Sequence, residues 1–211
     1  MEKQFLSIAF GWLLGLLSSI IIEYAKSRRR KHEVVSALKV ELEDLRFRLA
    51  VSSLQIAQTR GLLNQEFLVW IKPIVETYTG NEPHSSIRKA VESLATLDDQ
   101  NLARLVKQVQ VSDGVGLSLK TFHASFLETH LADISKMPLS TQRKIHEFRN
   151  HLNMLNQEIA KADDYQKMTF NKSFGDENIR RLHDEVNSKY VFVQERSKIA
   201  ATFIGSILSE I

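Results

Sequence analysis

The chain contains no cysteine among its 211 residues. This absence excludes disulfide bonds, thiol nucleophiles, iron–sulfur clusters and every zinc site that needs a cysteine ligand. Proline and glycine are scarce as well, with three and eight residues, which excludes collagen-like and low-complexity chains. A hydrophobic content of 43% and a charged content of 25% are typical of one folded domain.

Catalytic and phosphate-binding motifs are also missing. His146 and His151 resemble a zinc-protease pair, but a separation of five residues turns them about 140° apart on a helix, so they cannot share a metal. Gly114 and Gly116 form only a lone G-x-G without the lysine of a phosphate-binding loop. We therefore expect no enzymatic activity, no cofactor and no metal site.

Positive charge is concentrated in one short stretch, at Lys26, Arg28, Arg29, Arg30 and Lys31. The rest of the chain has 23 basic and 25 acidic residues. Nucleic-acid-binding proteins carry their basic excess on a face that contacts the phosphates. The distribution therefore predicts no nucleic-acid partner.

Residues 5–22, FLSIAFGWLLGLLSSIII, contain no charged side chain. As a helix they would extend about 27 Å, close to the thickness of the hydrocarbon core of a bilayer. The segment predicts a transmembrane anchor over residues 1–25. A cleaved signal peptide is the alternative, but the weakly charged start MEKQ and the lack of a small-residue cleavage site favour a retained span.

The basic stretch lies directly after the predicted span, whereas only Lys3 precedes it. By the positive-inside rule the N-terminus is outside and the remainder cytoplasmic, as in a single-pass protein of the inner membrane. The same cations would be attracted to anionic lipid headgroups. The lipid bilayer is thus the first expected partner.

Small residues recur every four positions in the predicted span, at Ser7, Gly11, Gly15 and Ser19. Such a ridge lets two helices approach closely in a membrane, so it predicts a homo-oligomer. The alternative is that glycine and serine are simply common in spans.

Residues 26–63 are expected to form one long helix, because neither glycine nor proline occurs between Gly15 and Gly61. One face carries a coiled-coil-like seam, and the opposite face carries Val40, Phe47 and Leu54. Two apolar faces predict two sets of neighbours, in the same chain or in another. The seam residues are Val35, Leu38, Leu42, Leu45, Leu49 and Ile56.

Residues 64–211 are expected to form a helical bundle that packs with 26–63. Helical 3-4 spacing predicts two long helices in residues 145–162 and 186–211, and a further helix in residues 117–135. Proline is expected to interrupt a helix at Pro73, and Ser86 and Asp98 are expected to cap two shorter helices. The predicted fold class is all-α.

An anchor, a self-association ridge and helix-packing seams without catalytic residues favour a membrane-anchored interaction or scaffold protein, with protein partners on the bundle. In layout the chain resembles uncharacterised bacterial proteins with one N-terminal span, a basic cluster and a helical body. The alternative function is a membrane-perturbing or membrane-sensing effector of a bacterial stress or phage-defence system.

Overall fold

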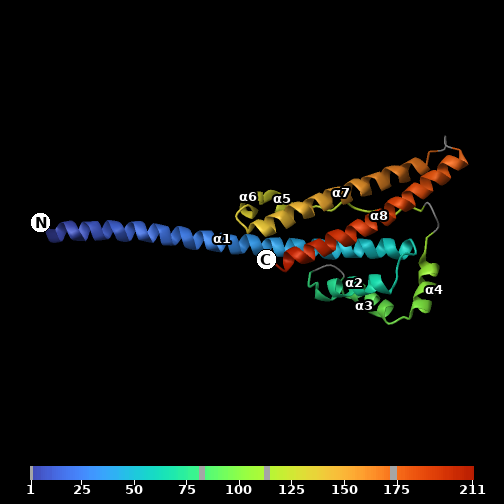
Figure 1. Cartoon of the computed structure of the whole chain (residues 1–211), viewed down its shortest axis with the longest axis horizontal. Helices are drawn as coiled ribbons and strands as arrows, with labels where there is room; N and C mark the ends of the chain where they lie inside the picture. Colours follow the sequence, from blue (N-terminus) through green and yellow to red (C-terminus); the bar gives the residue numbers. More distant parts are fainter. Residues whose placement is uncertain (1, 81–83, 112–114, 172–174) are drawn as a thin grey trace.

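A helix of 58 residues, α1 (Glu2–Thr59), is the central element of the computed structural model (Figure 1). The structure describes residues 2–80, 84–111, 115–171 and 175–211; the side chains of residues 2–11, 13, 14, 16, 19 and 84 lie outside this description. All secondary structure in the described ranges is helical. The all-α fold class is therefore confirmed. The expected long helix is uninterrupted, but it ends at Thr59 and not at the predicted residue 63.

The end of α1 follows from Gly61. Its φ of 72° lies in the left-handed region that favours glycine. The N–H of Leu62 donates to the carbonyl of Ala57 at 2.8 Å, the hydrogen bond of a Schellman motif. The chain thereby turns back along α1.

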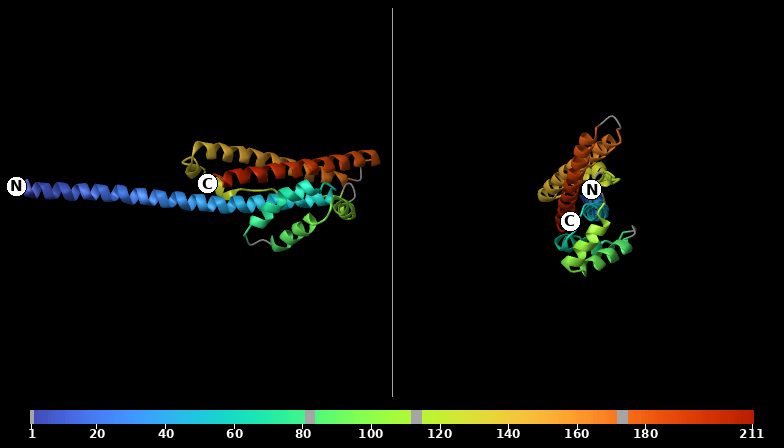
Figure 2. Two further views of the ribbon diagram at one scale, coloured as in Figure 1. Left: turned by 60° about the horizontal axis from the view of Figure 1, so that its bottom comes forward. Right: turned by 90° about the vertical axis from the view of Figure 1, so that its right-hand side faces the viewer.

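Two groups of helices cover opposite sides of α1 (Figures 1 and 2). On one side lie α5 (Ser125–Thr129), α6 (Leu131–Ile134) and the hairpin of α7 (Leu139–Thr169) and α8 (Asp176–Leu208). On the other side lie α2 (Gln65–Thr77), α3 (His84–Ala95) and α4 (Asp99–Val109).

Each side has its own hydrophobic core. Leu42 and Leu49 of α1 pack with Ile204 of α8 and Phe148 of α7 in the first core. Phe47 and Leu54 face the second core, and Tyr78, which follows α2, stacks on Phe47 with ring centroids 4.0 Å apart. Both predicted apolar faces of α1 are thus occupied. Val40 is an exception, because it is 65% exposed.

Three local predictions meet different outcomes. Asp98 caps α4 by accepting the N–H of Asn101 at 2.8 Å, as expected. Ser86 is wrong as a cap, because it lies inside α3. Pro73 does not interrupt α2. A proline there leaves the carbonyl of Val69 without its helical donor, but Val69 is exposed, so water can bond that carbonyl.

The helix predicted over residues 117–135 is mostly wrong. Residues 115–124 have no helical assignment, and only α5 and α6 follow them. Phe122 and Ile134 are nevertheless buried in the first core, and Leu119 and Phe126 pack against it partly buried. Phe122 therefore reaches the core from a segment that is not helical, although its apolar spacing predicted a helix.

Candidate functional site

The first half of α1 projects beyond all other helices (Figures 1 and 2). Among the described side chains of α1, Val34 is the first that is buried. Residues 2–29 extend about 42 Å at 1.5 Å per residue. Exposed apolar surface of this kind marks a site of interaction with a partner or a membrane. Among the side chains described in this segment, the large apolar ones that are exposed are Trp12, Leu17, Ile20, Ile21, Ile22 and Tyr24.

Over the described residues, we find no helix that combines the length and the apolarity needed to cross a membrane. The predicted span at residues 5–22 lies largely outside the described side chains, namely at residues 5–11, 13, 14, 16 and 19. The span, and the membrane location and orientation inferred from it, stay predictions.

Three of the four residues of the predicted small-residue ridge, Ser7, Gly11 and Ser19, have side-chain positions outside the description. Gly15 is described, and a Cβ atom placed on it would meet nothing within 4 Å. The helix surface at Gly15 is thus open within this chain.

All five basic residues after the apolar segment are exposed. Arg29 donates from Nε to Glu33 Oε1 at 2.9 Å, and Arg30 donates from Nη2 to Asp133 Oδ2 at 3.1 Å. Within the described ranges no ion pair involves Lys26, Arg28 or Lys31. Most of the cluster therefore remains available to an external anion.

Asp133 links this cluster to the bundle. Its other carboxylate oxygen accepts a hydrogen bond from Lys136 Nζ at 3.1 Å. The hydrogen bonds from Lys136 and from Arg30 lower the pKa of the Asp133 carboxyl below its usual value. A cavity of about 260 Å³ lies at this junction, lined by Ser27, Arg30, Lys31, Val34, Asp133, Lys136 and Met137.

Sequence reasoning found Arg30 and Lys31 but missed Lys136. A separation of more than a hundred residues from Arg30 hides this neighbour from any local pattern. Lys136 also lies in a short turn before α7 without a charge cluster of its own. Only the packing of α6 against α1 brings the three cations together.

The predicted helix seam is inside the molecule. Leu38, Leu42, Leu45, Leu49 and Ile56 are at most 1% exposed, and Val35 packs partly buried against the same core. Their nearest helix in the core is α8 of the same chain, and α7 contributes to the same core behind α8. A sequence pattern typical of a coiled coil thus describes intramolecular packing.

Three polar side chains that sequence reasoning missed hold residues 115–127 in place. Asn156 accepts the N–H of Phe122 at 2.9 Å and donates to its carbonyl at 2.8 Å. Tyr190 Oη accepts the N–H of Leu117 at 2.7 Å and donates to its carbonyl at 3.0 Å. Glu41 accepts the N–H groups of Phe126 and Leu127 at the start of α5.

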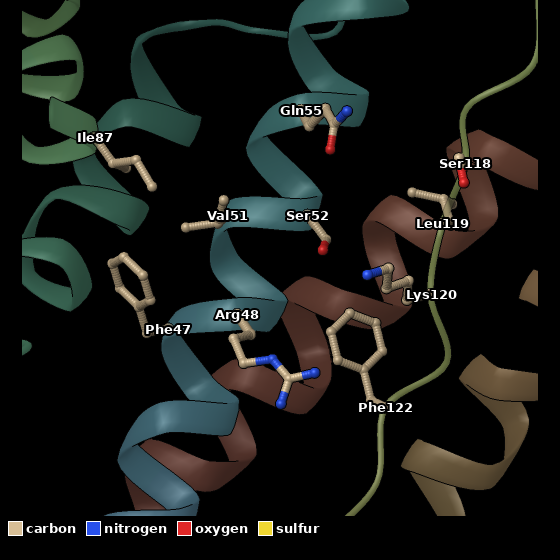
Figure 3. Close-up of a pocket in the computed structure, with 10 residues that line it drawn as sticks. All are labelled: Phe47, Arg48, Val51, Ser52, Gln55, Ile87, Ser118, Leu119, Lys120 and Phe122. Atoms are coloured by element: carbon tan, nitrogen blue, oxygen red, sulfur yellow. The ribbon is translucent and has the colours of Figure 1, made fainter. Parts of the chain in front are cut away.

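A groove between α1, α3 and the segment before α5 is the second surface feature (Figure 3). Arg48 of α1 points toward Phe122, with its guanidinium carbon 6.0 Å from the ring centroid. Lys120 comes from the facing segment and adds a second positive charge. Ser52 and Gln55 contribute uncharged polar groups from α1. This groove offers both apolar and cationic contacts.

Metal-ligating side chains do not assemble in the part of the chain that the structure describes. No group of three or more histidine, cysteine, aspartate or glutamate residues there is arranged to hold an ion. His146 lies on the exposed side of α7, and His151 lies tilted against Phe203 with ring centroids 5.4 Å apart.

Comparison with known proteins gives one relative. No family model matches the chain, and no solved structure matches it. A UPF0435 protein of Staphylococcus saprophyticus is 32% identical over 71 residues, which are 34% of this chain and 97% of the relative. The chain belongs to the UPF0435 family.

The UPF0435 match covers a third of the chain, and the relative's name states no ligand, reaction or partner. Its bacterial source agrees with the resemblance in layout to bacterial proteins.

Proposed function

We propose that this UPF0435 chain is a membrane-anchored, all-helical scaffold, with residues 5–22 as the anchor and the bundle at the cytoplasmic face of the inner membrane. The observation that carries the proposal is the projecting segment of α1, whose described apolar side chains are exposed and precede the basic cluster. Burial of apolar surface contributes about 25 cal/mol per Å². A lipid environment would supply that burial, and anionic headgroups would attract the cations.

Self-association through the projecting segment is part of the same proposal. The seam on α1 is already filled by α7 and α8, so it is not available to a second copy. The open surface at Gly15 and the four-residue spacing of small residues support contact between two anchors. The scaffold would thus assemble in the membrane and leave its bundle free.

Protein partners are proposed at the groove between α1, α3 and residues 118–122. Arg48 and Lys120 supply positive charge there, and Val51 and Leu119 supply apolar contacts. A partner with acidic and apolar side chains complements this lining.

Two measurements test the anchor and its orientation. Alkaline carbonate washing should leave the full chain in the membrane pellet, and an alkaline phosphatase fused after Ile211 should be inactive because it stays in the cytoplasm. Extraction into the supernatant, or an active fusion, would overturn the proposal. Changing Arg28, Arg29 and Arg30 together to glutamate should scramble the orientation.

The self-association is tested by replacing Gly11 and Gly15 together with isoleucine. The change keeps the segment apolar but places branched side chains on the ridge, so a membrane two-hybrid signal should fall to background. Leu13→Ile with Leu17→Ile is the matched control, because these positions lie on the opposite side of the helix. If the glycine double variant keeps the same signal as the control and the unaltered chain, the ridge is excluded as the contact.

A further inference from the structure

One end of the bundle lies next to the point where the projecting segment of α1 begins. Figures 1 and 2 show that α6, the start of α7 and the end of α8 all lie where α1 leaves the bundle. An ion pair between Lys144 of α7 and Glu210 joins two of these parts. If α1 is anchored in a bilayer, this end is the part of the bundle closest to the lipid.

The charges at this end favour an anion. Arg30, Lys31 and Lys136 line the cavity of about 260 Å³ against a single carboxylate, that of Asp133. Glu33, the acidic residue nearest in sequence to Arg30, is paired with Arg29. The lining therefore carries two more positive than negative charges. Asp133 holds the side chains of Arg30 and Lys136 together, since each donates to one of its oxygens.

Exposed apolar side chains lie close in sequence to the residues that line the cationic cavity. Leu131 at the start of α6 and Leu139 at the start of α7 are both exposed. Lys136 lies between them in the sequence, in the turn that joins the two helices. Exposed cationic and apolar side chains at one end of a domain are typical of sites that contact the interface of an anionic membrane.

The cavity is also at a suitable height. Arg30 follows Ile22, the last residue of the uncharged segment, by eight residues, which is about 12 Å along a helix. The headgroup layer of a bilayer extends roughly 5 to 8 Å beyond the hydrocarbon core. Because helical side chains lean toward the N-terminus, the Arg30 guanidinium can reach the outer part of this layer.

We propose that this cavity binds the phosphate group of an anionic phospholipid, so that the end of the bundle docks on the membrane surface. The inference rests on the proposed anchor and adds to it a specific lipid contact. Lys136 is the decisive residue, because it belongs to the bundle and not to the basic stretch next to the anchor.

The test measures how fast an amine-reactive reagent modifies Lys136 Nζ in the full chain, with mass spectrometry as the readout. Vesicles of phosphatidylcholine alone are compared with vesicles that also contain phosphatidylglycerol. We expect modification to be about fivefold slower with phosphatidylglycerol, in line with the attraction of one basic residue to an anionic surface. Lys167, near the other end of α7, should react equally fast in both.

Lys167 is a matched control. Its side chain is 68% exposed and pairs with Asp163 on its own helix, whereas the Lys136 side chain is 69% exposed and pairs with Asp133. Arg30→Gln should reduce the protection of Lys136. Arg181→Gln should leave it unchanged, because Arg181 pairs with Glu177 and is 73% exposed, against 69% for Arg30.

The outcomes separate this inference from the proposed function. Failure of the chain to float with the vesicles would overturn the anchor and the headgroup site together. Flotation with equal modification of Lys136 in both lipids would overturn the headgroup site alone. Equal protection by inorganic phosphate added to phosphatidylcholine vesicles would show a site for free anions, and would overturn the lipid as its ligand.

Discussion

At the scale of single residues, polar side chains decide the path of the segment between α4 and α5. Backbone N–H and C=O groups outside a helix need other partners when they are buried. Asn156 and Tyr190 supply such partners for Phe122 and Leu117. The free energy of unfolding should therefore depend on these two side chains more than on their polar neighbours.

Asn156→Ala should lower the free energy of unfolding by about 2 kcal/mol, because it leaves the N–H and the carbonyl of Phe122 without partners. Urea denaturation followed by circular dichroism measures the change. Asn153→Ala is the control on the same helix, since Asn153 is exposed. A similar loss in both variants would contradict a specific role for Asn156.

Tyr190 should make stability fall at alkaline pH. Burial raises the pKa of its hydroxyl above the ordinary value, although the hydrogen bond with the Leu117 backbone and the nearby Arg60 lower it. Tyrosine in the unfolded chain ionises first as the pH rises through about 10, so ionisation lowers the free energy of the unfolded state before it lowers that of the folded state. This contribution to stability is complete below that pH and is lost above it.

Comparison with Tyr190→Phe tests this dependence in urea denaturation between about pH 8 and pH 11. The variant should be less stable at the lower pH, because it loses the hydrogen bonds to Leu117. Its stability should then decline less steeply with pH than that of the unaltered chain. Parallel declines would show that Tyr190 does not titrate differently in the two states.

At the scale of elements, α1 stabilises the molecule through two faces that contact different neighbours. Leu42 belongs to the core with α7 and α8 and is fully buried. Phe47 belongs to the core with α2 to α4. The helix is thus the only described element with buried side chains in both cores over several turns.

Leu42→Ala should lower the free energy of unfolding by about 3 kcal/mol, because it leaves a cavity between α1 and the hairpin. Thermal and urea denaturation of the full chain measure the loss. Val40→Ala should change stability by less than about 0.5 kcal/mol, as is typical of exposed positions. A small effect at Leu42 would mean that this seam contributes little to the fold.

At the scale of the whole molecule, the projecting segment and the bundle are structurally separable. The described side chains before Val34 in α1 are exposed, and both cores begin at or after Val34. Removal of the segment should therefore leave the packing of the bundle intact.

A chain that begins at Lys26 should fold, with a melting temperature within a few degrees of the full chain and a monomeric mass by light scattering. The fragment should fold because it retains both cores. It should be monomeric because the seam on α1 is filled within the chain. Measurement requires circular dichroism and light scattering on the purified fragment. An oligomeric fragment would show that the bundle has its own self-association surface.

Sequence alone determined the features that depend on neighbours within a few turns. The all-α class follows from helical spacing of apolar residues, and the continuity of α1 follows from the lack of glycine and proline. The end of α1 at Thr59 lies four residues before the predicted boundary at residue 63. The cap at Asp98 and the two apolar faces of α1 are equally local. Such patterns are set by helix geometry and by backbone propensity, which require no knowledge of the partner.

Tertiary structure decided which surfaces meet. A leucine seam is the same pattern whether a second copy or α7 and α8 fill it, so only packing showed that it is intramolecular. Residues 115–124 have helical spacing but are not helical, because Asn156 and Tyr190 bond their backbone from another part of the chain. Arg30 and Asp133 are 103 residues apart and meet only because α6 packs beside α1. Contacts between distant segments depend on the global arrangement of the helices, which local sequence periodicity does not encode.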